Sequence, residues 1–282
     1  MIQTISDKLL LNDGNKMPAF GLGCYKAKND EIYRAVLWAL ETGYQMIDTA
    51  TRYENEKEVG KAIADSSIKR ESVFVVSKMW PTSYSTPQKA IEFTLKEMKL
   101  DYLDGYLLHW PSTNESLRYK AWETLLKYKE KGYIKSIGVS NFEVTHLESL
   151  IKEFGITPVV NQIELHPWYQ QKEICDYCKE HNIFVTAWGP IFRGHISEVP
   201  LMNELALKYE KSPVQVTLRW HIQKENIVIP KSSNQQRIQQ NTKLFDFSIE
   251  KEDMEKIDAL NCGKHFGDDP KLYDGDDFQC EK

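Results

Sequence analysis

One pattern occurs eight times along the sequence: a short apolar segment, a polar residue or glycine near its end, and an amphipathic helical segment. The apolar segments lie near residues 19–23, 44–48, 73–78, 104–109, 134–139, 158–163, 183–188 and 226–230. The helical segments between them include 30–42, 56–66, 87–98, 116–131, 144–154, 172–181 and 201–209. Short apolar segments rich in β-branched residues are typical of buried parallel strands, and each helical segment buries one face. The pattern therefore constrains the chain to an α/β fold with a parallel sheet.

Eight strand and helix units that close on themselves predict a (β/α)8 TIM barrel, and the main alternative is an open, doubly wound sheet. The length of 282 residues fits a single barrel domain over 1–282. Residues 9–18 contain an Asp13-Gly14 turn and predict a β-hairpin before the barrel. Residues 263–282 contain three glycines, one proline and six acids, and predict a loop over the barrel mouth rather than a second domain.

Composition narrows the class of partner. The net charge of −5 argues against nucleic-acid binding, which needs an excess of Lys and Arg. No long, charge-free apolar stretch predicts a membrane helix, and the first residues lack the features of a signal peptide. A cytoplasmic monomer acting on a small molecule is therefore expected. The five cysteines, at 24, 175, 178, 262 and 280, are odd in number and are expected to be reduced.

Polar or small residues follow the predicted strands at the point where each strand ends. They are Gly23, Asp48, Lys78, His109, Ser140 with Asn141, Gln162, Trp188, and Lys231 with Ser232. In a parallel barrel these positions meet at one mouth, where the chemistry takes place. Each residue also has a structural interpretation of its own, such as a turn cap or a core histidine. Their joint occurrence indicates a reaction site.

Four of these polar groups predict proton transfer to a carbonyl. Lys78 at the end of a buried strand requires an anion nearby, and Asp48 is the nearest candidate. A lysine cation beside Tyr53 is expected to lower the pKa of the phenol from about 10. Tyr53 would then act as a general acid, and His109 would donate a second hydrogen bond that orients the carbonyl. A hydride would have to come from elsewhere.

The segment 227–241 is the candidate cofactor site. Ser232 or Ser233 can cap the helix that follows, whose free N–H groups would attract a phosphate. Arg237 and Asn241 share one face of that helix. An ordinary capped surface helix is an equally good interpretation of this segment alone. No Gly-x-Gly-x-x-Gly motif occurs, which disfavours a Rossmann domain.

Metal and thiol chemistry receive little support. The seven histidines, at 109, 146, 166, 181, 195, 221 and 265, form no close pair of the kind that binds zinc, so a metal-dependent hydrolase is not expected. Cys175 and Cys178 have the CxxC spacing but lie in a helical pattern, which favours two structural thiols over a redox or metal site.

Taken together, these segments resemble the aldo-keto reductase family over almost the whole chain. The matching segments are 21–23, 47–60, 77–78, 103–111, 138–142, 161–162 and 230–232. Trp188-Gly-Pro190 resembles the diketogluconate reductase and prostaglandin F synthase type of member, since many other members have Tyr-Ser-Pro. The resemblance implies a barrel that binds NADPH without a Rossmann fold and reduces small aldehydes and ketones. A nicotinamide-sensing regulatory or binding protein on the same fold is the alternative.

The resemblance also implies a role for individual residues. The catalytic group is Asp48, Tyr53, Lys78 and His109. The cofactor group is Gly23, Cys24, Ser140, Asn141, Gln162, Trp188, Gly189, Lys231, Ser232, Arg237 and Asn241. Within it, Trp188 matches the aromatic residue that stacks on the nicotinamide, and Lys231 and Arg237 match the charges that bind the 2′-phosphate. Tyr25, Trp80 and Trp110 match an aromatic substrate pocket.

Overall fold

Eight parallel strands form the centre of the molecule. The computed structural model describes residues 2–272. The strands are β3 (Leu22–Gly23), β4 (Met46–Asp48), β5 (Phe74–Met79), β6 (Leu103–Leu108), β7 (Ile134–Ser140), β8 (Val160–Glu164), β9 (Phe184–Trp188) and β10 (Ile227–Val228). They pair in sequence order from β3 to β10. Parallel bridges from Phe20 to Val228 and from Gly23 to Lys231 join the first strand to the last. The predicted barrel is confirmed, and the open sheet is wrong.

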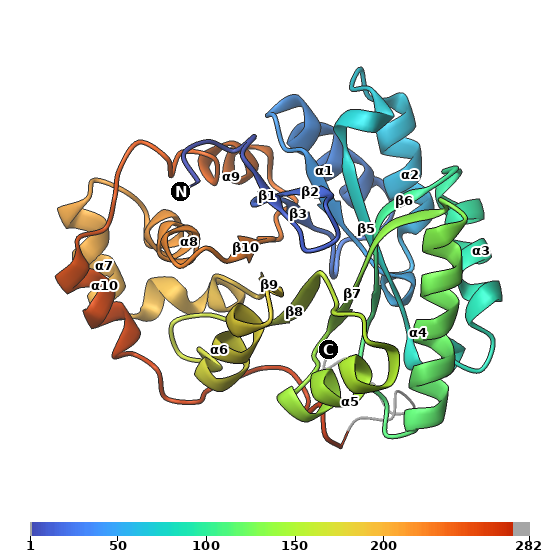
Figure 1. Cartoon of the computed structure of the whole chain (residues 1–282). Helices are drawn as coiled ribbons and strands as arrows, with labels where there is room; N and C mark the ends of the chain where they lie inside the picture. Colours follow the sequence, from blue (N-terminus) through green and yellow to red (C-terminus); the bar gives the residue numbers. More distant parts are fainter. Residues whose placement is uncertain (1, 273–282) are drawn as a thin grey trace.

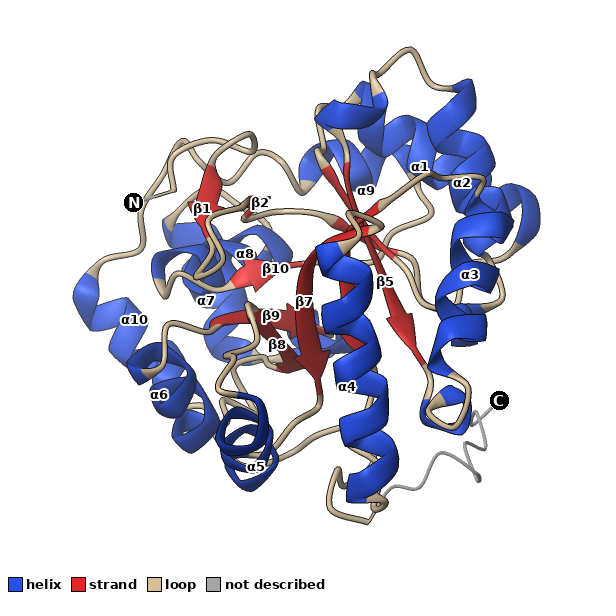
Figure 2. Ribbon diagram, turned by 45° about the vertical axis from the view of Figure 1, so that its right-hand side comes forward, coloured by secondary structure: helices blue, strands red, loops and turns tan. Residues whose placement is uncertain are grey.

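Helices form a layer outside the strands (Figures 1 and 2). They are α1 (Asn29–Glu41), α2 (Glu56–Asp65), α3 (Pro87–Met98), α4 (Glu115–Glu130), α5 (Val144–Phe154), α6 (Lys172–Glu180), α7 (Pro200–Lys208), α8 (Pro213–Gln223), α9 (Gln235–Gln240) and α10 (Lys251–Asp258). Within the described range, four short 3₁₀ helices lie in connections between strands and helices: η1 (Thr51–Tyr53), η2 (Arg70–Ser72), η3 (Pro81–Ser83) and η4 (Phe192–Glu198). The predicted helical segments agree with α1 to α7 within one or two residues, which is the usual uncertainty of a helix end.

Two helices, α8 and α10, were not expected. The start of α8 nevertheless carries a clear signal, because Ser212 and Gln215 form a capping box around Pro213, the first residue of the helix. The backbone N–H of Gln215 donates to Ser212 Oγ at 3.2 Å, and the backbone N–H of Ser212 donates to Gln215 Oε1 at 2.9 Å. The helix is buried along most of its length, so its apolar pattern does not show the one-sided period of a surface helix.

The predicted N-terminal hairpin is confirmed. Strand β1 (Lys8–Leu10) pairs antiparallel with β2 (Lys16–Pro18), and Gly14 in the connecting turn has φ +86°. Leu11 and Met17 are buried and pack against the apolar residues inside the barrel, such as Val160 and Ile227. The hairpin therefore covers one end of the barrel with apolar side chains. The polar strand ends lie at the other end.

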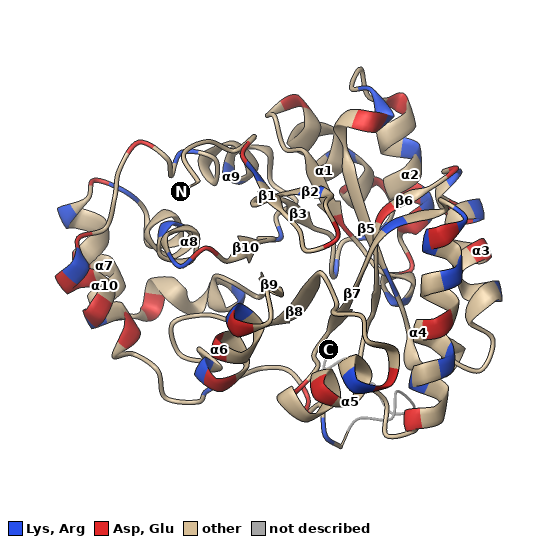
Figure 3. Cartoon of the chain, in the orientation of Figure 1, with Lys and Arg blue, Asp and Glu red and all other residues tan. Residues whose placement is uncertain are grey.

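The outer helices carry mixed charges, and the chain after α10 continues as a loop. Figure 3 shows acidic and basic residues interspersed along the outer helices, for example on α4. No helix in the range 2–272 is long and apolar enough to cross a membrane. After α10, residues 263–272 form no helix or strand, and the backbone N–H groups of Phe266 and Gly267 bond to Glu164 at the end of β8. The rest of the predicted loop, 273–282, lies outside the described residues.

Candidate active site

A buried ion pair lies at the C-terminal ends of two neighbouring strands. Asp48 is the last residue of β4, and Lys78 lies one residue before the end of β5. Lys78 Nζ donates to Asp48 Oδ1 at 2.6 Å and to the carbonyl of Thr49 at 2.8 Å. The side chains are 0% and 3% exposed, respectively. Because an unpaired charge would be costly at such a site, the contact between the ammonium and the carboxylate compensates for the burial of both groups in the barrel wall.

Tyr53 lies beside this ion pair, in the short 3₁₀ helix η1 that follows β4. Lys78 Nζ is 5.2 Å from the centre of the Tyr53 ring. Burial of the phenol, and then the nearby Asp48 carboxylate, raise the pKa of Tyr53 well above its usual value. The prediction of a lowered pKa is therefore wrong, because burial of the phenol and the nearby Asp48 carboxylate outweigh the attraction between the Lys78 ammonium and a phenolate. A phenol in this state keeps its proton at neutral pH and can give it only to a strong base.

His109 follows β6 and faces both Tyr53 and the predicted substrate pocket. Its ring centre is 5.6 Å from that of Tyr53 and 5.0 Å from that of Trp80. Burial, and then the positive charges of Lys78 and Arg52, hold the pKa of His109 well below its usual value, so the ring is neutral. Its Nδ1 atom is buried and has no hydrogen-bond partner in the described part of the chain. A neutral imidazole offers one donor and one acceptor.

The polar residues on the opposite strands are tied to these groups by hydrogen bonds. Gln162 Nε2 donates to Asp48 Oδ2 at 2.8 Å, and Ser140 Oγ donates to the carbonyl of Gln162 at 2.8 Å. Asn141 Nδ2 donates to the carbonyl of His109 at 3.0 Å. The indole N–H of Trp188 donates to Asn141 Oδ1 at 2.8 Å. The residues predicted to hold the nicotinamide thus also orient the residues predicted to carry the chemistry.

The predicted substrate residues gather above the same point. The Tyr25 ring centre is 5.0 Å from that of Tyr53. Trp80 and Trp110 are buried and pack against each other as a small separate cluster. The backbone carbonyl of Trp110 accepts a hydrogen bond from the hydroxyl of Tyr84 at 2.6 Å, which fixes this part of the wall. The result is a largely aromatic surface next to Tyr53.

The segment after β10 carries the donors expected of an anion site. Lys231 Nζ lies 3.2 Å from Glu31 Oε1 and 3.3 Å from Ser233 Oγ, and Arg237 is exposed one helical turn before Asn241. Two cations, hydroxyls and an amide fit a phosphate group chemically. The predicted cap is wrong, however: Asn234 Oδ1 caps α9 by accepting from the backbone N–H of Arg237 at 3.0 Å.

Two glycines at the barrel mouth occupy positions where a side chain would clash or be strained. A Cβ atom on Gly23 would lie 2.6 Å from the carbonyl oxygen of Ile229, so no larger residue fits between β3 and the end of β10. Gly189, directly after Trp188, has φ +62°, a conformation that glycine adopts without strain. A side chain at Gly23 would crowd the backbone after β10, and a side chain at Gly189 would strain the turn after Trp188.

Cys24 lies at the end of β3 and is fully buried. Its Sγ atom is within 3.9 Å of the carbonyl of Leu22, and burial raises the pKa of the thiol. Cys175 and Cys178 lie on α6 as free thiols whose pKa values burial raises to about 11 and about 12. These thiols are poor nucleophiles at neutral pH. Among the described residues, no three His, Cys, Asp or Glu side chains gather as metal ligands.

We therefore expect Cys24→Ala to retain most of the wild-type turnover. The substitution removes one buried sulfur atom, which affects packing, and it removes no group that could take part in proton transfer. Turnover with a small aldehyde, measured together with thermal unfolding, checks this. Complete loss of turnover in a folded Cys24→Ala variant would contradict a packing role for this thiol.

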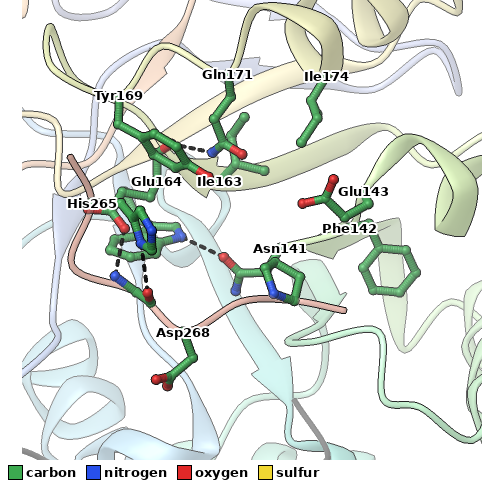
Figure 4. Close-up of a pocket in the computed structure, with 13 residues that line it drawn as sticks. Asn141, Phe142, Glu143, Ile163, Glu164, Tyr169, Gln171, Ile174, His265 and Asp268 are labelled. Carbon is green, nitrogen blue, oxygen red and sulfur yellow. Dashed lines mark hydrogen bonds between the residues drawn. The ribbon is translucent and has the colours of Figure 1, made fainter. Parts of the chain in front are cut away.

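Glu164 is a further site residue that sequence reasoning missed. It is buried at the end of β8, where Oε1 bonds to His166 Nε2 at 3.0 Å and the backbone N–H groups of Phe266 and Gly267 donate to Oε1 and Oε2 at 2.9 and 2.8 Å. Figure 4 shows Glu164 and Asn141 in the wall of the pocket that the C-terminal segment covers. A signal existed, because Glu164 lies two residues after Gln162 and therefore on the same side of the strand.

Comparisons with known proteins place the chain among described sequences. A family model described as "Aldo/keto reductase family" matches residues 19–262. The methylglyoxal reductase DkgA of Escherichia coli is 42% identical over 267 residues, which cover 94% of this chain and 97% of that protein. The glyoxal reductase of Bacillus subtilis is 43% identical over 274 residues, covering 96% and 98%.

Solved structures are similar to this chain over almost its whole length. The crystal structure of MGS-M4, an aldo-keto reductase enzyme from a deep-sea metagenome library, has a TM-score of 0.91 at 40% identity and covers 94% of this chain and 99% of that chain. A crystal structure of a Gox0644 mutant in complex with NADPH has a TM-score of 0.91 at 35% identity, covering 97% and 99%.

Proposed function

This chain belongs to the aldo/keto reductase family, and from this premise we propose that it is an NADPH-dependent reductase of small aldehydes and ketones. The observation that supports the proposal is the arrangement at the barrel mouth. Tyr53, the Lys78–Asp48 ion pair and His109 come from three neighbouring strand ends and meet below an aromatic pocket. A proton donor, a fixed positive charge and a neutral donor are the groups that carbonyl reduction requires.

In this proposal Tyr53 supplies the proton. Its raised pKa keeps the phenol protonated, and the oxyanion that develops on a reduced carbonyl is basic enough to remove that proton. Lys78 supplies the compensating charge, because its ammonium lies 5.2 Å from the centre of the ring that becomes negative. Asp48 keeps that ammonium in place through a 2.6 Å hydrogen bond. The step therefore ends with the proton on the product alcohol and the developing phenolate charge opposite Lys78.

His109 orients the carbonyl. Because its pKa is lowered, the ring is neutral and does not compete with Tyr53 as an acid. A neutral imidazole N–H can still donate to the carbonyl oxygen, and that hydrogen bond strengthens as negative charge develops on the oxygen. Asn141 fixes the position of His109 by bonding to its backbone carbonyl. The aromatic residues Tyr25, Trp80 and Trp110 would exclude water from the same region.

The residues around the mouth fit NADPH. When bound, NADPH would supply the hydride for the reduction. Trp188 would lie against the nicotinamide, and Ser140, Asn141 and Gln162 would bind its carboxamide. Cys24 would contact it through packing, and Gly23 and Gly189 would let the backbone approach. Lys231, Ser232, Arg237 and Asn241 would bind the 2′-phosphate.

Cofactor preference tests the phosphate end of this proposal. Arg237→Ala is expected to raise the Kd for NADPH by roughly ten- to hundredfold and to leave the Kd for NADH nearly unchanged, because a charge-assisted hydrogen bond contributes on the order of 1.5–3 kcal/mol. Titration of both cofactors, followed by tryptophan fluorescence, measures this. Equal weakening of NADPH and NADH would show that Arg237 supports the fold or the adenine instead.

Steady consumption of NADPH tests the proposal as a whole. The purified protein is incubated with NADPH and a panel of small aldehydes and ketones, and the absorbance of NADPH is followed. We expect turnover with several aldehydes, with loss of activity when Tyr53 is replaced. Tight NADPH binding without turnover on any member of the panel would favour a nicotinamide-sensing protein.

A further inference from the structure

A carboxylate lies among the groups proposed to bind the 2′-phosphate. Glu31, in the first turn of α1, has its Oε1 atom 3.2 Å from Lys231 Nζ, which also lies 3.3 Å from Ser233 Oγ. A hydrogen bond from the Ser233 hydroxyl, and then the contact with Lys231, lower the pKa of Glu31, so the carboxyl is ionised at neutral pH. The side chains of Lys231 and Glu31 are 36% and 47% exposed, so a ligand can reach both.

The closure of the barrel brings this carboxylate to the segment after β10. Helix α1 is the first helix after β3, and the parallel bridge from Gly23 to Lys231 joins β3 to that segment. Helix α1 also packs against α9, the helix that carries Arg237 (Figure 2). The first helix of the barrel and the segment after its last strand therefore lie together, although they are far apart in the sequence. The contact between Glu31 and Lys231 follows from this arrangement of the backbone.

The charged residues next to Glu31 in the sequence form other ion pairs. Asp30 pairs with Arg34 at 2.8 Å, and Lys28 pairs with Glu54 at 2.7 Å. A glutamate in the first turn of a helix also stabilises that helix through its dipole. That structural role would affect stability alike with either cofactor, and it does not require contact with a cation outside the helix. The ion pair with Lys231 is what connects Glu31 to the proposed cofactor site.

We propose that Glu31 limits the preference of this protein for NADPH over NADH by pairing with Lys231. The inference rests on the proposed function, because it assigns the 2′-phosphate to Lys231. A phosphate at Lys231 competes with Glu31 for the ammonium group and brings a second anion close to the carboxylate, which is unfavourable. NADH carries a hydroxyl in place of the phosphate, and a hydroxyl can donate a hydrogen bond to a carboxylate. Glu31 therefore weakens the binding of NADPH and tolerates NADH.

Cofactor titrations test the inference. The Kd values for NADPH and NADH are measured by tryptophan fluorescence for the wild type and for Glu31→Gln. The ratio of the Kd for NADH to the Kd for NADPH is expected to rise roughly three- to tenfold in Glu31→Gln, because an exposed ion pair and a contact between like charges each contribute modestly. The rise should come mainly from tighter binding of NADPH. In a Lys231→Met background, Glu31→Gln should raise the ratio less, because no ammonium group remains to be released.

Asp30→Asn is the matched control, because it also removes one carboxylate from the first turn of α1, and that carboxylate pairs with Arg34. It should leave the ratio near the wild-type value. An unchanged ratio in Glu31→Gln, an equal rise in Asp30→Asn, or an equal rise with and without Lys231 would overturn the inference. The titrations measure binding alone. Absence of NADPH consumption with every aldehyde would instead overturn the proposed function, and the ratio would still decide the inference.

Discussion

Replacing Tyr53 with phenylalanine is expected to lower kcat for carbonyl reduction by about 10²–10⁴-fold, since general acid catalysis typically contributes that factor. The phenol oxygen is the only proton donor proposed in the site. His109 cannot replace it, because burial keeps the imidazole neutral. The affinity for NADPH should stay within a few-fold, because the substitution removes one oxygen and keeps the ring. Steady-state kinetics with a small aldehyde and a fluorescence titration of NADPH measure the two quantities.

Tyr128→Phe is a suitable control for this experiment. It also removes a single tyrosine hydroxyl, but that hydroxyl bonds to Glu92 Oε1 at 2.8 Å between two outer helices. We expect its kcat to match that of the wild type. A Tyr53→Phe variant that keeps a substantial share of the wild-type kcat would show that another group delivers the proton, and the roles given to Lys78 and His109 would then need to change as well.

The barrel could be predicted from the sequence because its strands alternate regularly with helices. A strand buried on both faces has an almost uninterrupted apolar sequence, and Asp48 and Lys78 stand out because they interrupt it. The end of the barrel was harder to predict. Helix α8 is buried around most of its circumference, which removes the one-sided pattern, and only its capping box at Ser212 marks it.

The composition of the site was predicted better than its electrostatics. Sequence indicates which groups are neighbours, and Asp48, Tyr53, Lys78 and His109 do gather. It does not indicate how far each group is removed from water, and desolvation is the largest cause of the raised pKa of Tyr53. The hydrogen bond from Trp188 to Asn141 depends on side-chain conformation, which no sequence pattern specifies.

The ion pair of Lys78 and Asp48 leads to the second large effect. Lys78→Met keeps most of the length of the side chain and removes its charge, so Asp48 remains as a buried carboxylate to which Gln162 Nε2 still donates. Breaking a buried ion pair in this way typically lowers the free energy of unfolding by about 3–5 kcal/mol. Turnover should also fall strongly, because no cation then faces the Tyr53 ring. Urea unfolding and steady-state kinetics measure the two losses.

A double variant separates the two roles of the ion pair. In Lys78→Met combined with Asp48→Asn, neither charge remains, so much of the lost stability should return. Turnover should not return, because the positive charge opposite Tyr53 is still missing. Recovery of stability without activity would mean that the pair is kept for chemistry, and that the fold merely accommodates it. If activity returned together with stability, the ion pair would act only by supporting the barrel, and the electrostatic role proposed for Lys78 would be wrong.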